Sequence, residues 1–284
     1  MHPTGTYYDR LSRWTAVSRL LGYGGGSETF TVHRALSDPR AQGRATSTRL
    51  HDLLVESLPR FDRPRVLDAG CGLGGTAIDL ASRLGATCTG ITLSAAQAER
   101  GRRAAHEAGL ASAIEILVGD YDHPPAGPFD LIVAIESLAH SADPGTSVAA
   151  LAARLAPGGC LAVVDDLPTA AARETADLAL FKSGWRLPVL WTRAAFLSAF
   201  ADLGLTVVVD RNLSTEVRPR SAARIRQLAA LNRLAHALIP SDAMREMLDS
   251  YHGGLALERL YLAGRIEYRL MIARRPGNVP GAAV

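Results

Sequence analysis

A buried strand that runs directly into a glycine-rich turn constrains this 284-residue chain more than any other feature of its sequence. Residues 66–69 read Val-Leu-Asp-Ala, and residues 70–75 follow as Gly-Cys-Gly-Leu-Gly-Gly. Glycines let a backbone approach a ligand without a Cβ in the way, and the start of the next helix offers unpaired N–H donors. This order is typical of a nucleotide site at the carboxyl edge of a parallel sheet.

From residue 65 onward, short apolar runs alternate with helical patterns, which indicates a parallel sheet covered by helices. Strands are predicted at 66–69, 87–91, 114–118, 131–135 and 160–164, and helices at 76–84, 94–108 and 147–155. The Pro-Gly-Gly of residues 157–159 is predicted to be a turn that begins the fifth strand. The expected fold class is therefore α/β, with a doubly wound, mostly parallel, Rossmann-like sheet.

The chain is expected to have three parts. Residues 1–60 form an N-terminal preface of helices and loops, 61–168 form the cofactor-binding core, and 169–284 form a helical cap with the last two strands. In the last part, helices are predicted near 170–183 and 193–203, a strand at 205–209, a helical tract to about 262 and a strand at 265–272. We expect the tract from 170 to 262 to be inserted between late strands and to cap the carboxyl edge of the sheet.

Composition excludes several kinds of partner and site. The 31 basic residues exceed the 28 acidic ones by three, which is too few for sequence-independent binding to nucleic acid. The three cysteines form no CxxC pair and the histidines are scattered, so neither a disulfide framework nor a metal site is expected. No apolar run approaches the ~20 residues that span a bilayer, and the N-terminus lacks a signal-peptide pattern. We expect a cytoplasmic protein without membrane insertion, and a homo-oligomer is left open.

The glycine turn by itself allows two classes of cofactor. Gly70, Gly72 and Gly75 satisfy the GxGxxG pattern of a nicotinamide or flavin dinucleotide site. That site also needs an acid about 20 residues later, at the end of the second strand. Residues 90–94 read Gly-Ile-Thr-Leu-Ser there and contain no carboxylate. The turn instead carries its acid two residues before the first glycine, at Asp68.

Residues 68–74, Asp-Ala-Gly-Cys-Gly-Leu-Gly, resemble the first motif of the class I S-adenosylmethionine-dependent methyltransferases. Residues 90–94 with Gln97 are similar to the second-strand motif of the branch that contains sterol, cyclopropane-fatty-acid and prenyl methyltransferases. Residues 119–121 and 155–159 resemble two later motifs, in the same order and spacing. The resemblance covers residues 60–166 best. It implies S-adenosyl-L-methionine as cofactor and S-adenosyl-L-homocysteine as product.

The resemblance also assigns roles to individual residues. It implies that Gly70 and Gly72 approach the methionine part, Asp68 its ammonium, Thr92, Leu93 and Gln97 the ribose, and Asp120 the adenine amino group, with Tyr121 and Ile135 also at the cofactor. Structural explanations stay open for three of them. Asp68 can be a structural acid, Gln97 can complete a capping box with Ser94, and Asp120 can close a turn.

The fourth strand ends in Ile-Glu-Ser at 135–137, followed by His140, and this sequence resembles that of the sterol and prenyl-chain methyltransferases. An alkene that attacks a sulfonium methyl becomes a carbocation, which needs negative charge or π faces nearby and then a base. Glu136 can supply both, and His140 is the second candidate for the base. Alternatively, Glu136 caps a helix or pairs with an arginine, and His140 is a packed core residue.

Residues in the preface and the cap are expected to contact the acceptor, with Tyr23 and Trp185 as the substrate-binding candidates. A diphosphate acceptor would require cations, for which Arg34, Arg40, Arg44 and Arg49 are near in sequence; they can equally be solvated. The pair at 165–166, Asp-Asp, could hold Mg²⁺ beside a diphosphate or cap a turn. No metal is assigned.

The sequence therefore predicts a small-molecule C-methyltransferase that acts on a prenyl or terpenoid alkene through a carbocation, in secondary metabolism. The alternative is an O- or N-methyltransferase for a phenolic or amine natural product, whose acceptor brings its own lone pair. A nonenzymatic cofactor-binding module is the third possibility, and it gives no reason for an acid such as Glu136 at an enclosed site.

Overall fold

The computed structural model describes residues 33–172, 175–239 and 241–277. Its centre is a seven-stranded sheet with the order β5-β4-β3-β6-β7-β9-β8. The strands are β3 (Arg65–Ala69), β4 (Thr87–Thr92), β5 (Ile114–Val118), β6 (Phe129–Ile135), β7 (Leu155–Pro168), β8 (Thr206–Asn212) and β9 (Ile266–Arg274). Among these strands, β9 alone runs antiparallel to its neighbours, β7 and β8. The predicted doubly wound, mostly parallel α/β fold is confirmed.

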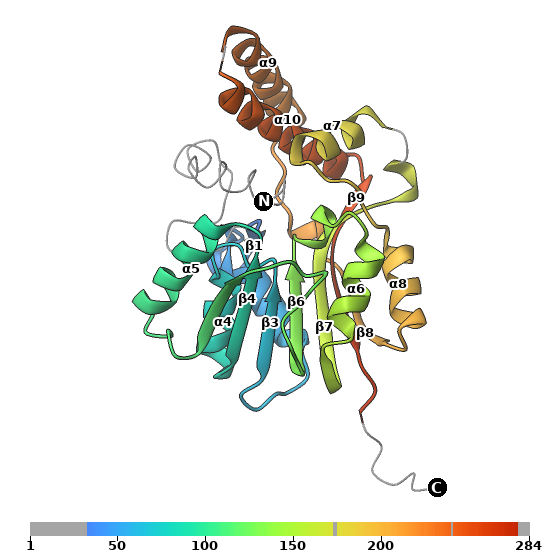
Figure 1. Ribbon diagram of the computed structural model, residues 1–284. Helices are drawn as coiled ribbons and strands as arrows, with labels where there is room; N and C mark the ends of the chain where they lie inside the picture. The colour runs from blue at the N-terminus through green and yellow to red at the C-terminus, as the bar shows by residue number, and fades with distance from the viewer. Residues whose placement is uncertain (1–32, 173–174, 240, 278–284) are drawn as a thin grey trace, which may run out of the picture.

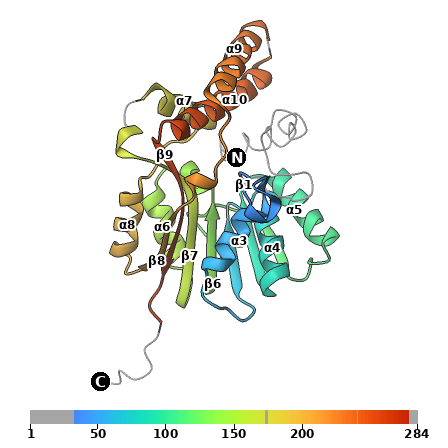
Figure 2. The ribbon, with the colours of Figure 1, turned by 180° about the vertical axis from the view of Figure 1, so that it is seen from behind.

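Helices cover both faces of the sheet, and each face has its own hydrophobic cluster (Figures 1 and 2). One face carries α3 (Thr48–Ser57), α4 (Gly75–Leu84) and α5 (Ala95–Glu107), which contribute buried residues such as Leu53 and Leu80. The other face carries α6 (Pro144–Ala152) and α8 (Arg193–Asp202), through residues such as Leu151 and Phe200. The strands are apolar on both sides because they lie between these two layers.

The strand order reverses between β3 and β6, and this places their carboxyl ends next to each other. The hydroxyl of Ser137, just after β6, donates to the carbonyl of Ala69 at 2.8 Å. A Cβ on Gly70 would lie 2.4 Å from the Cβ of Ser137, and Gly70 has a φ of 87°. Gly70 is thus required by the neighbouring strand end, at the point in such sheets where ligands bind.

The prediction of a turn at residues 157–159 is wrong, because β7 already begins at Leu155 and runs through them. Pairing with β6 passes from Phe129–Leu155 directly to Leu131–Cys160, so the extra residues form an irregularity inside the strand. Gly158 has a φ of 79° there, which is the conformation that its glycine allows at no steric cost.

The inserted helical tract is divided differently from the prediction. Helix α8 belongs to a sheet face, next to α6, and the cap consists of α7 (Ala176–Trp185), α9 (Ala222–Leu238) and α10 (Asp242–Leu262), which lie beyond the carboxyl edge of the sheet (Figures 1 and 2). Short elements that the sequence did not predict are the strand pair β1 (Leu36–Ser37) and β2 (Ala45–Thr46) and 3-10 turns at Pro39–Ala41, Leu138–His140, Ala170–Ala172 and Ser214–Glu216. Within the described residues, no helix has the length and apolar character to cross a bilayer.

Helices α7 and α10 cross at a pair of glycines, and this contact leads to a stability prediction. A Cβ on Gly184 would lie 2.5 Å from the carbonyl oxygen of Asp249 and 2.9 Å from the Cα of Gly253. We expect Gly184→Ala to lower the free energy of unfolding by about 1 to 3 kcal/mol, because two backbones must separate. Urea unfolding followed by circular dichroism measures the loss. Gly277→Ala is the matched control, since a Cβ there meets nothing within 4 Å; equal stabilities of the two variants would contradict the prediction.

Candidate active site

The glycine turn after β3 has the left-handed backbone conformation that its glycines allow. Gly70, Gly72 and Gly74 have φ values of 87°, 54° and 79°. The N–H groups of Gly70 and Cys71 both donate to the carbonyl of Ile91 at the end of β4, at 3.0 and 2.9 Å. Helix α4 then begins without a side-chain cap. In its first turn, the N–H of Ala77 bonds to the carboxylate of Asp68.

Asp68 provides a test of whether the predicted cofactor fits. Its side chain is 2% exposed, and its Oδ2 has no hydrogen-bond partner among the described residues. Burial raises the pKa of Asp68 to about 7, against an opposing hydrogen bond from the backbone of Ala77. A buried acceptor without a donor is unfavourable, and the ammonium of a bound S-adenosylmethionine would satisfy it. The residues present fit the cofactor.

The residues predicted to hold the ribose form a small buried network at the end of β4. The hydroxyl of Thr92 donates to Oε1 of Gln97 at 2.8 Å, and the N–H of Gln97 donates to the hydroxyl of Ser94 at 3.1 Å. Ser94 therefore caps α5 with its hydroxyl, which is one half of a capping box, while its N–H donates to the hydroxyl of Thr92 at 3.3 Å. The network holds both side chains at the carboxyl edge, and their contact with a ribose stays a prediction.

A cavity of about 1010 Å³ lies between the sheet edge and helix α7. Its walls are formed by Leu93, Asp120, Tyr121, Asp122, His140, Ser141, Ala142, Thr175, Ala176, Leu178, Ala179, Lys182, Ser183, Arg186, Leu187 and Pro188. Four residues singled out from the sequence, namely Leu93, Asp120, Tyr121 and His140, thus share one cavity. Its volume is at the upper end of the range for small-molecule pockets, which leaves room for an acceptor beside a nucleoside.

Two of these wall residues also have partners in the protein. Oδ1 of Asp120 accepts the N–H of Asp122 at 3.0 Å, so the turn-closing explanation holds for this carboxylate in addition to any ligand role. The hydroxyl of Tyr121 donates to the carbonyl of Ser137 at 3.1 Å. This bond fixes the ring of Tyr121 between the ends of β5 and β6.

Glu136 lies directly after β6 in a conformation that non-glycine residues seldom adopt, with a φ of 49°. Its N–H donates to the carbonyl of Val164 on β7 at 2.8 Å. Its Oε1 accepts the hydroxyl of Tyr268 at 2.8 Å and the N–H of Arg34 at 3.1 Å. Such backbone strain costs of order 1 kcal/mol and persists where the surroundings enforce it, often at functional sites.

Arg34 is the residue around which the carboxylates at this edge are arranged. Its Nη2 is 2.7 Å from Oδ2 of Asp166, and its Nε is 3.5 Å from Oε1 of Glu136. The guanidinium carbon lies 5.0 and 4.8 Å from the ring centroids of Tyr261 and Tyr268. Burial alone would lower the pKa of Arg34, but the attraction of Asp166 and its neighbours holds that pKa well above its ordinary value. The arginine pairing considered for Glu136 is therefore present in the structure.

The two aspartates at the end of β7 are committed to protein partners. Oδ1 of Asp165 accepts the N–H of Asp166 at 2.9 Å, and its Oδ2 accepts the N–H of Ala139 at 3.1 Å. Asp166 pairs with Arg34 and accepts the hydroxyl of Tyr261. Burial raises the pKa of Asp165 to about 8 and that of Asp166 to about 6. In the part of the chain that is described, no group of three or more His, Cys, Asp or Glu side chains could hold a metal ion.

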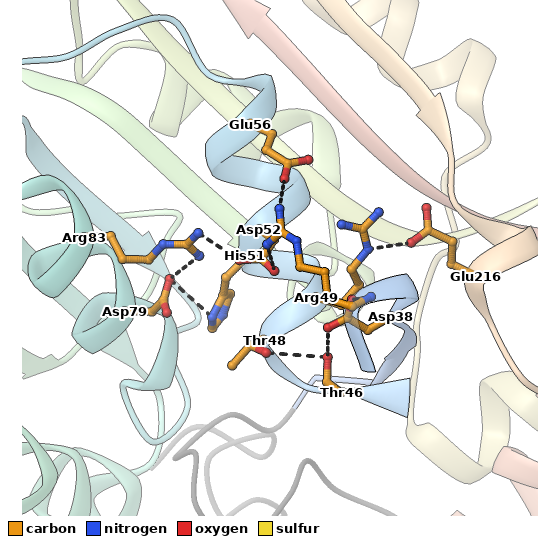
Figure 3. Close-up of polar contacts among 11 residues, drawn as sticks. Asp38, Thr46, Thr48, Arg49, His51, Asp52, Glu56, Asp79, Arg83 and Glu216 are labelled. Carbon is orange, nitrogen blue, oxygen red and sulfur yellow. Dashed lines mark hydrogen bonds and ion pairs between the residues drawn. The ribbon is translucent and has the colours of Figure 1, made fainter. Parts of the chain in front are cut away.

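The other arginines considered for a diphosphate lie in surface networks. Arg49 pairs with Glu216 at 3.0 Å (Figure 3), and Arg40 pairs with Asp52 and Glu56 at 3.0 and 2.9 Å. Arg44 is exposed and donates to the carbonyl of Ala41. These three side chains make no contribution to the cavity walls.

The remaining candidates are distributed over several places. His140 is buried in the cavity wall, where burial lowers its pKa to about 4 against the charge of Glu136, so it is neutral at pH 7. Trp185 lies in the α7–α10 interface, where its indole N–H donates to the carbonyl of Ser250 at 3.0 Å and its ring meets Phe181, and it is not among the residues that line the cavity. Ile135 is buried at the end of β6 in a hydrophobic cluster. Tyr23 lies outside the described residues.

Sequence reasoning missed two features of the site. The pairing of Tyr261 and Tyr268 with the acids gave no local signal, because their partners are distant in sequence. Lys182 is the only lysine of the chain, which could have drawn attention to it, and it lines the cavity from α7.

The sequence pattern of the methyltransferase-domain family matches residues 39–209. A probable chloroplastic tocopherol O-methyltransferase of Oryza sativa subsp. japonica is 30% identical over 265 residues, which is 89% of this chain and 70% of that protein. A sterol 24-C-methyltransferase of Gibberella zeae is 30% identical over 166 residues, 57% of this chain and 43% of that protein. The chain thus spans less than half of the second relative.

Two solved structures share the fold over nearly the whole chain. The [4+2]-cyclase SpnF superposes with a TM-score of 0.72 at 22% identity, covering 96% of this chain and 95% of that one. A geranyl diphosphate C-methyltransferase of Streptomyces coelicolor A3(2) has a TM-score of 0.70 at 18% identity, covering 96% and 98%. The same architecture therefore carries more than one chemistry, and the acceptor must be argued from the site.

A buried histidine pair below the edge predicts how stability depends on pH. Nε2 of His33 is 2.9 Å from Nε2 of His51, whose Nδ1 is 3.6 Å from Asp79 (Figure 3 shows the His51–Asp79 contact). Burial, and then His51, lower the pKa of His33 to about 4 from 6.5. Between pH 6.5 and about 4, His33 binds a proton in the unfolded chain but not in the folded protein. The free energy of unfolding therefore decreases as the pH falls through this range, by about 3 kcal/mol in total.

Between pH 6.5 and about 4, the slope of the free energy of unfolding against pH reports how many protons are taken up on unfolding. We expect this number to be lower by about one in His33→Gln than in the wild type. The comparison is made by urea unfolding of both proteins at several pH values in this window. The exposed His106 provides the control, and His106→Gln is expected to leave the slope as in the wild type. A wild-type slope in His33→Gln would show that His33 titrates normally in the folded protein.

The left-handed conformation of the glycine turn predicts how cofactor binding responds to mutation. Gly72→Val forces a β-branched residue into a φ of 54° where the backbone must approach the ligand. We expect no S-adenosylmethionine binding by calorimetry, with circular dichroism unchanged. Gly85→Val is the matched control, because Gly85 has a φ of 61° at the other end of α4. An unaltered affinity in Gly72→Val would mean that this turn does not contact the cofactor.

Proposed function

The chain belongs to the class I S-adenosylmethionine-dependent methyltransferases, and from that premise we propose that it methylates a carbon atom of a prenyl or terpenoid alkene. S-adenosylmethionine supplies an electrophilic methyl group when it is bound. The new C–C bond takes its electrons from the alkene, so the acceptor becomes a carbocation, which then loses a proton. The chain must therefore stabilise positive charge and accept one proton.

The observation that carries this proposal is the charge balance around Glu136. Glu136 and Asp166 place two carboxylates beside the single guanidinium of Arg34. Asp166 and Tyr268 are buried, Arg34 and Glu136 are partly buried, and the rings of Tyr261 and Tyr268 face the guanidinium. A group of two carboxylates around one cation favours a positive charge that develops nearby. A carbocation in the adjoining site has this property, whereas a neutral phenol does not need it.

The contacts of the arginines considered for a diphosphate favour a neutral, preformed acceptor, although Lys182 and Arg186 of the cap also line the cavity. Arg34, Arg40 and Arg49 are paired with carboxylates, so they do not offer free cations to a diphosphate. Asp165 and Asp166 are likewise engaged with protein donors. A prenylated or terpenoid natural product needs neither group. The tocopherol and sterol methyltransferases among the relatives are consistent with an acceptor of this kind.

Glu136 and His140 divide the two tasks in this proposal. The carboxylate of Glu136 is held in place by Tyr268 and by the N–H of Arg34; it is not among the residues that line the cavity, and in this proposal its charge acts on the acceptor from behind that wall. His140 lines the cavity in its neutral form and can take the proton. Cap helix α7 covers one side of the cavity and reduces the access of water, which would otherwise trap a carbocation.

Methylation of oxygen or nitrogen is the second candidate, and a specific observation favours it. His140 is neutral and lines the cavity, which is what a base for a phenol requires. The relative that covers most of this chain is also an O-methyltransferase. In that reaction the acceptor supplies its own lone pair, and the charge of Glu136 has no role in the transition state.

The Glu136→Gln variant separates the two candidates. It keeps the shape and the hydrogen-bonding capacity of the side chain and removes its charge. For an alkene acceptor we expect turnover to fall by at least about 100-fold, the scale for such electrostatic groups, with S-adenosylmethionine affinity within a few-fold of the wild type. For a lone-pair acceptor the loss is mild and His140→Ala is severe. Methyl transfer from labelled S-adenosylmethionine to a panel of prenylated metabolites gives the rates, and NMR of the product gives the methylated atom.

A matched control is available in Glu216, which is also paired with an arginine but follows β8 in a 3-10 turn, away from the end of β6. Glu216→Gln is expected to leave turnover unchanged. If Glu136→Gln keeps nearly normal turnover on the true acceptor, Glu136 has no part in the mechanism, and the preference for carbon over oxygen or nitrogen is lost.

A further inference from the structure

Three leucines on helix α9 are exposed to an extent that is unusual for large apolar side chains. Leu231, Leu234 and Leu238 are 60%, 58% and 72% exposed. Their spacing of three and four residues places them on the same side of the helix. The opposite side of α9 is already used, because Ile225 and Ala229 pack in a buried cluster with α10. The leucine face therefore has no partner among the described residues.

The charges on α9 indicate what this face contacts. The helix carries Arg224, Arg226 and Arg233 and no acidic residue. The three guanidinium groups form no ion pair or hydrogen bond with the described part of the chain, although most of its other arginines are paired. Helical geometry at 100° per residue puts Arg224 on one flank of the leucine face and the other two on the opposite flank. An apolar face between free cations is typical of a helix that lies in the surface of an anionic bilayer.

We propose that α9 is a docking surface for an anionic lipid bilayer, in which the three leucines enter the interface and the flanking arginines bind lipid phosphates. A second copy of this chain is a less suitable occupant. Two α9 helices that paired through their leucines would bring arginines together with no acid on either helix to oppose them. A bilayer that contains acidic lipid supplies the missing negative charge.

The position of α9 connects this surface to the site. Helices α9 and α10 project from the body of the molecule as a helical hairpin (Figures 1 and 2). The same α10 packs against α7, which lines the cavity, through Gly184 and Gly253. Docking through α9 would thus hold helix α7, which forms one wall of the cavity, close to the membrane, where a prenylated acceptor partitions. Only this use of the surface rests on the proposed function; the docking itself does not.

Flotation of the full-length protein with lipid vesicles tests the proposal. We expect the wild type to float with vesicles of equal parts phosphatidylcholine and phosphatidylglycerol, and to stay behind with phosphatidylcholine alone. Binding should weaken when salt is raised, because exposed charges are screened. The variant L231S/L234S/L238S and the variant R226Q/R233Q are each expected to lose at least about tenfold in the bound fraction at limiting lipid.

Two controls carry the same chemistry elsewhere on the surface. Val208→Ser removes an exposed apolar side chain from β8, and Arg103→Gln removes an exposed arginine from α5. Both are expected to bind vesicles as the wild type does, and circular dichroism verifies that every variant is folded. Because flotation requires no acceptor, its outcome is independent of whether the proposed reaction is correct.

Three outcomes would overturn the proposal. The first is wild-type flotation of the leucine variant, which would place any lipid contact elsewhere. The second is equal binding to the neutral vesicles, which would remove the role of the arginines. The third is no vesicle binding together with a dimer in light scattering that L231S/L234S/L238S converts to a monomer, which would assign the face to a second copy of the chain.

Discussion

The buried guanidinium of Arg34 is the interaction on which the arrangement of the carboxyl edge depends. It joins the segment before β1 to Asp166 at the end of β7, while the rings of Tyr261 on α10 and Tyr268 on β9 lie against it. Removing one partner of a buried ion pair costs about 3 to 5 kcal/mol, because the other charge is left without compensation. Segments that are far apart in the sequence therefore hold one another in place, and Glu136 is fixed among them.

The same pairing limits what the carboxylates can do. Asp166, held by Arg34 and Tyr261, is not available as a metal ligand, and Asp165 is occupied by two backbone N–H groups. Glu136 keeps one oxygen, Oε1, for both of its protein donors. Its other oxygen, Oε2, is therefore left at the end of β6, on a residue whose backbone is held in a strained conformation with a φ of 49°.

The sequence predicted the central strands well because a buried parallel strand is a nearly continuous apolar run, as at Ile114–Val118, where both bounds are as predicted. The glycine turn was predictable for a similar reason, since its chemistry is local. The partners of Arg34 were not, because Glu136 and Asp166 lie 102 and 132 residues away. Helix α8 was assigned to the cap because an apolar helix has the same pattern on a sheet face as in a cap; only its contact with α6 distinguishes the two.

The division between sheet and cap also separates two kinds of specificity. Asp68 lies on β3, and the glycine turn joins β3 to α4, which is where the cofactor is predicted to bind. The acceptor side of the cavity comes from α7, which contributes Leu178, Ala179 and Lys182. Helix α7 is held by α10 through a contact between two glycines, so its position depends on the cap rather than on the sheet. Differences in acceptor among proteins of this fold are therefore expected to reside in the cap and in the residue that follows β6, and not in the turn that identifies the family.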